Sequence, residues 1–285
     1  MSDRRERRRD VGQSIFADEI GLEYGIYGDY RLHSAVQPIF APRGTALEPV
    51  AVEALIQPRL GGRPVAPQPF LESVPAGDRL YVESLCRALH LRNFQFVGVD
   101  GLDLFFNYNP RVNDHSGRAL AEIRLMARHL DDYGLDAGML VCEITEQAAG
   151  NDEVLRRTVA EMRRAGLRIA VDDFGAGHST EERLLLLEPD IVKIDGGWFA
   201  EVCRHAAAEK LFRPLLSLLH DHGAKVLVEG IERPDQLQIA LEGGADLLQG
   251  YLLGRPVPVG TIFPAQPLAL DDLLRPSAKV IPLFG

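Results

Sequence analysis

The run Ile169-Ala170-Val171-Asp172-Asp173 places two carboxylates directly after three apolar residues. A short apolar run without polar alternation is typical of a parallel strand that is buried on both faces. Six further runs also end in a residue that can bind a divalent metal or an anionic substrate: Ala51-Val52-Glu53, Leu104-Phe105-Phe106-Asn107, Met139-Leu140-Val141-Cys142-Glu143, Ile191-Val192-Lys193-Ile194-Asp195, Val226-Leu227-Val228-Glu229 and Leu247-Leu248-Gln249. Polar groups gathered at strand ends are expected in a (β/α)₈ barrel, whose active site lies at the carboxyl ends of its strands.

Helical patterns alternate with these runs. The segments 116–132, 154–162 and 201–222 are amphipathic, and a glycine follows each of them within a few residues. Pro214 is expected to break or kink the last of these helices. The Val36–Phe40 segment supplies an eighth strand candidate, so the sequence predicts an α/β fold, a TIM-like (β/α)₈ barrel.

We expect two regions of different order along the chain. Residues 1–20 are polar, lack periodicity and contain the cluster Arg4-Arg5-Glu6-Arg7-Arg8-Arg9, which indicates a flexible basic tail. That cluster is either a solvated arm or a contact with a protein, a membrane or nucleic acid. Residues 21–285 are expected to form a single barrel domain, which ends in a proline-rich wrapped segment from Pro256 with a short helix near 268–274.

Composition narrows the class of protein. No apolar stretch is long enough to cross a bilayer, and three scattered cysteines indicate neither zinc nor disulfides, so we expect a cytoplasmic protein. The formal net charge of −10 disfavours DNA or RNA binding. An anionic substrate would therefore need local Lys, Arg or bound metal.

Four of the strand-end side chains offer only oxygen ligands: Glu53, Asn107, Glu143 and Asp172. Such ligands select Mg²⁺ or Mn²⁺ over zinc. Asp172 and Asp173 could divide two metals, and a metal pair can support an in-line phosphoryl displacement. The alternative is that one aspartate caps the following helix while the other is solvated.

Other charged residues fit supporting roles. Lys193 is either a salt-bridge partner of the carboxylates or a cation that steadies the nucleophilic water and the phosphate oxygens. Of Glu229 and Glu232, one could act as a base while the other orients it or binds metal. Glu146 has the same offset from Glu143 and could brace the loop after Asp173.

Taken together, these residues resemble the EAL-domain family of cyclic di-GMP phosphodiesterases. The motifs that carry the resemblance run in order from about residue 35 to 257: Gln37-Pro38-Ile39, Glu53-Ala54-Leu55, Phe106-Asn107-Tyr108-Asn109-Pro110, Glu143-Ile144-Thr145-Glu146, Asp172-Asp173-Phe174-Gly175-Ala176-Gly177, Lys193-Ile194-Asp195, Glu229-Gly230-Ile231-Glu232, Gln249-Gly250-Tyr251 and Arg255-Pro256.

The resemblance implies a barrel whose first strand is antiparallel to the rest, and hydrolysis of cyclic di-GMP to linear pGpG with two Mg²⁺ or Mn²⁺ ions. It also implies roles for individual residues. The catalytic residues would be Glu53, Lys193 and Glu229; the metal ligands Glu53, Asn107, Glu143, Asp172, Asp173 and Glu229; the substrate contacts Gln37, Leu55, Arg59, Asp195 and Gln249; and the loop supports Glu146 and Glu232. A homodimer and a regulatory protein partner are further implications.

The chain departs from the family pattern at the substrate-binding groups. Gln57 stands where members commonly have an arginine, His178 replaces a frequent tyrosine, and the segment Phe70–Pro75 differs from the usual rim sequence. None of these departures removes a predicted metal ligand, so they bear on substrate affinity more than on chemistry. The alternative function is a catalytically weak or inactive cyclic di-GMP receptor that signals through a protein partner, which loss of Glu53, Lys193 or Glu229 would favour. A metal-dependent lyase acting through an enolate is a third possibility. Trp198 is either a packing residue or a platform for a base.

Overall fold

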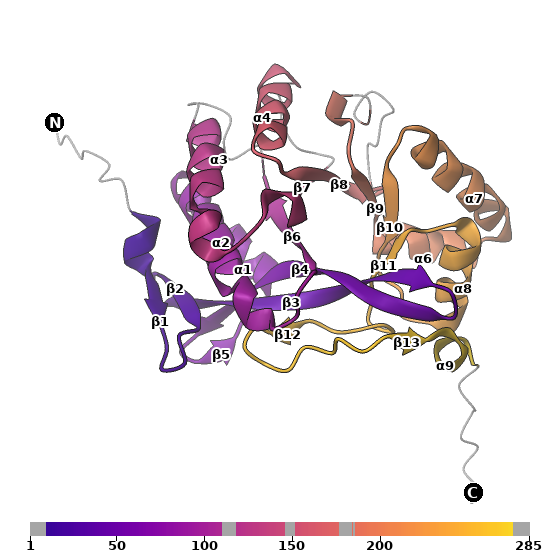
Figure 1. Cartoon of the computed structure of the whole chain (residues 1–285), viewed down its shortest axis with the longest axis horizontal. Coiled ribbons are helices and arrows are strands. Elements are labelled where there is room, and N and C mark those ends of the chain that lie inside the picture. Colours follow the sequence, from indigo (N-terminus) through magenta and orange to yellow (C-terminus); the bar gives the residue numbers. More distant parts are fainter. Residues whose placement is uncertain (1–9, 110–117, 146–151, 177–183, 185, 276–285) are drawn as a thin grey trace, which may run out of the picture.

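The structure is a computed structural model that describes residues 10–109, 118–145, 152–176, 184 and 186–275 (Figure 1). Its strands are β1 (Ile15–Ala17), β2 (Glu23–Tyr27), β3 (Tyr30–Arg43), β4 (Ala46–Leu60), β5 (Arg63–Pro64), β6 (Asp103–Tyr108), β7 (Leu140–Thr145), β8 (Arg168–Phe174), β9 (Ile191–Ile194), β10 (Lys225–Val228), β11 (Leu247–Leu248), β12 (Val257–Pro258) and β13 (Leu268–Ala269). Its α-helices are α1 (Pro67–Ser73), α2 (Arg79–Asn93), α3 (Arg118–His129), α4 (Asp152–Arg164), α6 (Gly196–Arg204), α7 (Ala206–Asp221), α8 (Pro234–Gly243) and α9 (Leu270–Leu274). The 3₁₀ turns are Val11–Ser14, Ala76–Asp78, Phe94–Val97, Asp131–Tyr133 and Ala137–Met139.

Within the described residues, eight strands close into a barrel in the order β3-β11-β10-β9-β8-β7-β6-β4, because β4 pairs back onto β3. Parallel pairing links β4 through to β11, whereas β3 is antiparallel to both of its neighbours. The predicted barrel with an antiparallel first strand is confirmed.

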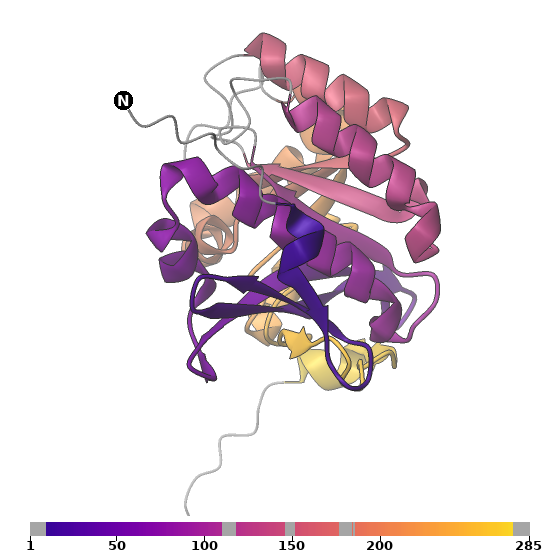
Figure 2. The ribbon, with the colours of Figure 1, turned by 90° about the vertical axis from the view of Figure 1, so that its left-hand side faces the viewer.

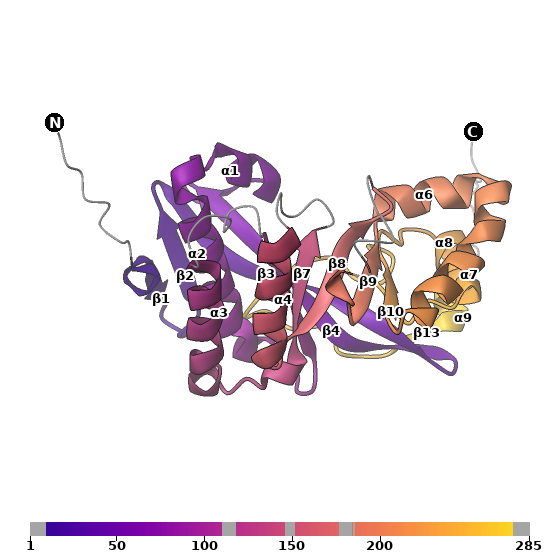
Figure 3. The same cartoon turned by 90° about the horizontal axis from the view of Figure 1, so that it is seen from above.

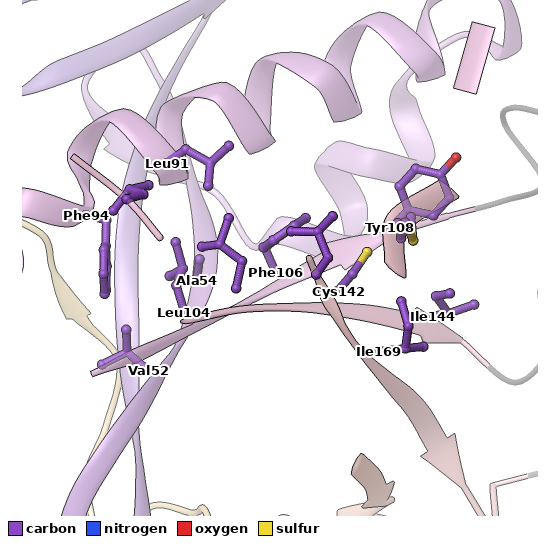
Figure 4. Close-up of a cluster of buried hydrophobic side chains, with 14 of the residues drawn as sticks. Val52, Ala54, Leu91, Phe94, Leu104, Phe106, Tyr108, Cys142, Ile144 and Ile169 are labelled. Atoms are coloured by element: carbon purple, nitrogen blue, oxygen red, sulfur yellow. The ribbon is translucent and has the colours of Figure 1, made fainter. Parts of the chain in front are cut away.

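Alternation along each strand separates an inner layer from an outer layer. The inner layer contains one residue from each barrel strand at the same level: Ile39, Ala51, Phe105, Val141, Ala170, Ile191, Leu227 and Leu247. The outward-facing neighbours pack beneath the surrounding helices, as Figure 4 shows for Leu104, Phe106 and Cys142 with Leu91 of α2. Both faces of the strands are thus covered, which explains why the runs are apolar throughout.

The amino-terminal strands extend this barrel. β1 and β2 continue the sheet from β3, and in Figure 2 the indigo strands face the viewer. Residues 11–14 form a 3₁₀ turn and 15–17 form β1, so the tail expected over residues 1–20 is wrong for the described part of that segment. Cross-strand pairing with β2 orders a segment whose own sequence lacks periodicity.

The segment 201–222 contains a helix break in a different place from the one predicted. α6 ends at Arg204 and α7 begins at Ala206, while Pro214 lies inside α7. His205 has an extended backbone (φ −124°, ψ 104°), and this residue separates the two helices seen in Figure 3. α9 (Leu270–Leu274) confirms the short helix expected near the carboxyl terminus.

Candidate active site

A ring of polar side chains lies one step above the inner hydrophobic layer. On each parallel strand the polar residue comes two positions after the residue of the inner layer. On antiparallel β3 the polar residue comes two positions before the residue of the inner layer. The ring consists of Gln37, Glu53, Asn107, Glu143, Asp172, Lys193, Glu229 and Gln249. Every barrel strand therefore contributes one polar group to the same end of the barrel.

Glu53 belongs to this ring although it lies in the middle of β4 and not at the end of that strand. The parallel pairing of β4 with β6 stops at Glu53 and Phe105, whereas the antiparallel pairing with β3 runs on to Leu60. The polar residue thus marks the end of the barrel portion of the strand. The strand itself continues beyond the barrel.

Lys193 lies at the centre of four carboxylates. Its Nζ is 2.9 Å from Glu229 Oε1, 3.1 Å from Asp172 Oδ1 and 3.6 Å from Glu53 Oε1, and it also forms an ion pair with Glu143. The lysine side chain is 1% exposed and that of Glu143 is fully buried. The predicted salt-bridge role of Lys193 is therefore present in the structure.

Burial and mutual repulsion alter the ionisation of these groups. Burial raises the pKa of Glu229 to about 8, with Asp172 and Glu53 adding to the rise and Lys193 opposing it. Burial likewise raises the pKa of Glu143 well above its usual range, against the effect of Lys193. For Lys193 burial alone would lower the pKa, but the four carboxylates together hold it well above its ordinary value.

The Asp172-Asp173 pair reaches one cavity because β8 is irregular at this point. Its register with β9 shifts between Val171 and Phe174, and Asp173 has a left-handed backbone (φ 60°) that is uncommon for a residue other than glycine. The Asp173 N–H donates to Asp172 Oδ1 at 3.0 Å. Both aspartates line the same pocket, as predicted.

Two glutamines and an aspartate have defined partners at this end of the barrel. Gln249 Nε2 donates to Glu53 Oε2 at 2.8 Å, and Gln37 Nε2 donates to the Gly254 carbonyl at 3.1 Å. Asp195 caps α6 by accepting a hydrogen bond of 2.7 Å from the Trp198 N–H. Asp195 thus positions the helix whose first turn borders the pocket.

The pocket has a volume of about 620 Å³ and opens over β8–β11 and β3. The predicted site residues along its wall are Gln37, Glu53, Asp172, Asp173, Lys193, Asp195, Glu229, Glu232 and Gln249. Gly196 and Gly230 form part of the same wall, and a Cβ on Gly230 would lie 2.7 Å from the Gly196 Cα. This close approach of two backbones brings α6 against the loop after β10.

Leu55 and Asn107 border a different cavity. This second pocket, of about 590 Å³, lies between β4, β6 and α1–α2 and is lined mainly by apolar side chains. β4 and β6 separate after Glu53 and Phe105, which opens this space beside the ring. The predicted metal ligand Asn107 is therefore exposed toward the second pocket and does not line the first.

Arg59 lines neither of the two pockets, and its contact with substrate stays a prediction. It pairs with Arg31 on the part of β4 beyond the barrel, and Gln57 pairs there with His33. Glu146 and His178 lie outside the described residues. Trp198 packs against Gly175, where a Cβ would lie 2.8 Å from the indole, so the structure favours its packing role.

The sequence did not single out the cations of the first pocket. Arg204 and Arg233 both line it, together with Tyr251. Gly196, Ala200 and Arg204 recur at a spacing of four, so they share one face of α6. The need for cations in a chain of charge −10, combined with this spacing, could have identified Arg204.

The carboxylate and amide oxygens of the polar ring are ligands of the type that divalent cations such as Mg²⁺ and Mn²⁺ bind. Glu143 Oε2 and Gln249 Oε1 are buried and have no hydrogen-bond partner among the described residues. The side chains as they lie are arranged around the Lys193 ammonium, and no group of three or more His, Cys, Asp or Glu in the described ranges is arranged to hold an ion. A cation would therefore require carboxylates to turn away from Lys193.

A profile of the EAL domain matches residues 29–256 of this chain. The chain belongs to the EAL domain family. This match spans the whole barrel from β3 to the segment before β12 and includes every residue of the polar ring. No helix in the described ranges is both long and apolar enough to span a membrane.

Curated relatives of this EAL domain include two phosphodiesterases by name. The probable cyclic di-GMP phosphodiesterase PdeA of Escherichia coli (strain K12) is 35% identical over 48% of this chain and 18% of its own length. The cyclic di-GMP phosphodiesterase NbdA of Pseudomonas aeruginosa is 31% identical over 52% of this chain and 18% of its own length. The chain thus spans about a fifth of the length of these relatives.

Solved structures share the fold. The YkuI protein of Bacillus subtilis, in complex with its substrate c-di-GMP and calcium, aligns with a TM-score of 0.70 and 26% identity over 81% of this chain and 57% of that chain. The manganese and cyclic di-GMP complex of Klebsiella pneumoniae BlrP1 aligns with a TM-score of 0.71 and 25% identity over 84% of this chain and 59% of that chain. Both neighbours bind a divalent metal together with the dinucleotide.

Proposed function

We propose that this EAL domain is a metal-dependent phosphodiesterase that hydrolyses cyclic di-GMP to linear pGpG. The observation that carries the proposal is the polar ring, in which four carboxylates from separate strands surround Lys193. The relatives named as phosphodiesterases and the neighbours that bind c-di-GMP with metal support the choice of substrate.

Bound divalent cations, two Mg²⁺ or Mn²⁺ ions, would supply Lewis acidity and lower the pKa of water. Glu53, Asn107, Glu143 and Asp172 would hold one ion, and Asp173 the second, with Glu229 as a further ligand or as the base. The orphaned oxygen of Glu143 supports this assignment.

The protein groups then have distinct tasks. Lys193 Nζ, buried and held by the carboxylates, presents a fixed cation toward the attacking water and the phosphate oxygens. Glu229, whose Oε1 lies 2.9 Å from Lys193 Nζ, can accept the water proton when its carboxylate is ionised. Gln249 fixes the orientation of Glu53 through its hydrogen bond.

Substrate contacts are drawn from both pockets. We assign Gln37, Asp195 and Gln249 in the first pocket and Leu55 at the second to the dinucleotide, and Glu232 to the support of Glu229. Glu232 is held through its N–H by Gln236 Oε1 at 2.9 Å. The support of the loop after Asp173 by Glu146 remains a proposal from the sequence.

The deciding experiment is turnover of cyclic di-GMP by the purified chain with Mn²⁺ or Mg²⁺, followed by chromatography of the products. Formation of pGpG that is lost in Glu53→Gln and Glu229→Gln supports the proposal. Tight binding of cyclic di-GMP without product would instead identify the receptor alternative.

A further inference from the structure

The parts of β3 and β4 beyond the barrel join β1, β2 and β5 in a five-stranded antiparallel sheet. One face of this sheet packs on α2: Leu32 and Ile56 are buried there, and a Cβ on Gly25 would lie 2.9 Å from Leu89. Because side chains alternate along a strand, the intervening residues lie on the opposite face. We call that face the aromatic–arginine surface, formed by Phe16, Tyr24, Arg31, His33, Gln57 and Arg59.

Three rings form a ladder across the sheet. Phe16 and Tyr24 are directly paired, with ring centroids 6.0 Å apart and planes inclined by 28°. Tyr24 and His33 follow at 5.8 Å and 25°. Phe16 is 44% exposed, whereas Tyr24 and His33 are half-buried. Phe16, at the open end of this ladder, offers an exposed ring on which a nucleobase can stack.

Two arginines stand beside the ladder in an unfavourable arrangement. Arg31 and Arg59 lie directly opposite each other in the β3–β4 register, and like charges in that position destabilise a sheet. Neither arginine forms an ion pair with a residue in the described ranges, although the Arg31 guanidinium lies 5.4 Å from the centre of the Tyr24 ring. An anion placed between them would relieve this repulsion.

We propose that the aromatic–arginine surface binds a nucleotide with a terminal phosphate, the base stacking on the exposed ring of Phe16 and the phosphate lying between Arg31 and Arg59. A long nucleic acid is disfavoured by the net charge of −10, whereas one phosphate is balanced by the arginine pair. An acidic peptide would use the arginines but leave the exposed ring of Phe16 unused.

Most of this surface lies away from the candidate active site, although Gln57 stands where resembling sequences carry an arginine that contacts substrate. None of its six residues lines either of the two pockets described above. Gln57, its nearest member on β4, lies four residues beyond Glu53, which corresponds to about 13 Å along the strand. The inference therefore does not depend on the proposed hydrolysis.

A fluorescent reporter can test the surface by itself. Trp198 is the only tryptophan of the chain, so a Phe16→Trp/Trp198→Phe variant places the sole indole in the ladder. We expect guanosine 5′-monophosphate to quench its emission saturably, and guanosine or ribose 5-phosphate to bind at least about 10-fold more weakly. Adding Arg31→Gln and Arg59→Gln should weaken the nucleotide by a similar factor, whereas Arg213→Gln, on the exposed face of α7, should not.

Absence of quenching, or quenching unaffected by the two arginine substitutions, would overturn the proposal. Equal binding of ribose 5-phosphate, or tighter binding of a hexaglutamate peptide, would also overturn it by showing an anion or peptide site. If circular dichroism shows that the reporter variant does not fold, calorimetric titration of the nucleotide into the unaltered chain and into the Arg31→Gln/Arg59→Gln variant gives the same comparison. Identical isotherms would then overturn the proposal.

Discussion

The side-chain amide of Gln249 donates a 2.8 Å hydrogen bond to Glu53 Oε2, although 196 positions separate the two residues in the sequence. Gln249 follows β11 and Glu53 lies in β4, and antiparallel β3 runs between these strands. The bond therefore exists only because the barrel is closed. It fixes one carboxylate of the proposed metal site.

Gln249→Ala should lower kcat for cyclic di-GMP by about 10- to 100-fold, because an orienting contact to a metal ligand is lost. Steady-state kinetics at saturating Mn²⁺ measure the effect. Gln238→Ala is a matched control, since Gln238 is exposed on α8 and bonds only its neighbour Glu242. A variant with unchanged kcat would show that Glu53 needs no orienting partner.

Lys193→Met should abolish measurable turnover and destabilise the metal-free protein by about 3–5 kcal/mol, because it leaves buried carboxylates unpaired. The pKa of Glu229 is raised above its unfolded value, so the folded state binds its proton more tightly and stability falls as the pH rises from 4.5 toward 8. Without the lysine, this fall in stability with pH should be larger. The free energy of unfolding in urea should therefore be lower than that of the unaltered chain by a greater amount at pH 8 than at pH 6.

The companion variant Lys193→Met/Glu143→Met tests the same cause. It replaces the most buried ion pair of the cluster by apolar groups, and we expect it to recover much of the lost stability without recovering turnover. If Lys193→Met lowers the free energy of unfolding equally at both pH values, and the second substitution does not restore it, unpaired buried carboxylates are not the cause of the destabilisation.

Removal of metal by a chelator should stop turnover, and Mn²⁺ or Mg²⁺ should restore it. Because a ligand that binds only the folded state stabilises it, Mn²⁺ should also raise the unfolding temperature of the chain. Glu53→Gln should reduce this rise and Glu242→Gln, on the surface of α8, should leave it intact. An unfolding temperature that does not respond to Mn²⁺ would argue against a resident metal.

Gln57→Arg should lower KM for cyclic di-GMP several-fold with little change in kcat, because it restores the arginine that resembling sequences carry and adds uniform binding. Gln57→Glu should raise KM by placing a negative charge at the same position. Kinetics on both variants test the point. If neither changes KM, this position lies outside the reach of the substrate.

The buried His90 predicts a second pH effect, which is distinct from that of the carboxylates around Lys193. Its ring lies 3.0 Å from Ser34 Oγ, and burial followed by the charge of Arg87 lowers the pKa to about 4. The unfolded chain, with a value of 6.5, therefore takes up the proton first as the pH falls. Stability of up to about 3 kcal/mol is lost between pH 6.5 and 4.

A His90→Gln variant isolates this contribution from that of the many carboxylates. The difference in unfolding free energy between the variant and the unaltered chain should shrink as the pH falls from 7 to 5. Urea denaturation at the two pH values measures it, and a constant difference would mean that folding does not shift the pKa of the imidazole.

Much of the barrel was predictable from short apolar runs, because strands covered on both faces need no polar residues within them. The run 169–173 gave both the strand and the two aspartates. Two other features could not be predicted from the sequence. β1 has no hydrophobic periodicity of its own, and no proline or glycine marks the break between α6 and α7 at His205. Both depend on contacts with distant segments.

The sequence by itself determined which residue types stand at the mouth of the barrel, since alternation places the residue two positions beyond a core residue on the same face. The tertiary structure decided which of these side chains contact one another. Asn107 lies at the second pocket, and Arg59 lies beside Arg31 beyond the barrel. Lys193 forms ion pairs with four carboxylates. Strand register and barrel closure set these distances, and both arise from packing between residues far apart in the chain.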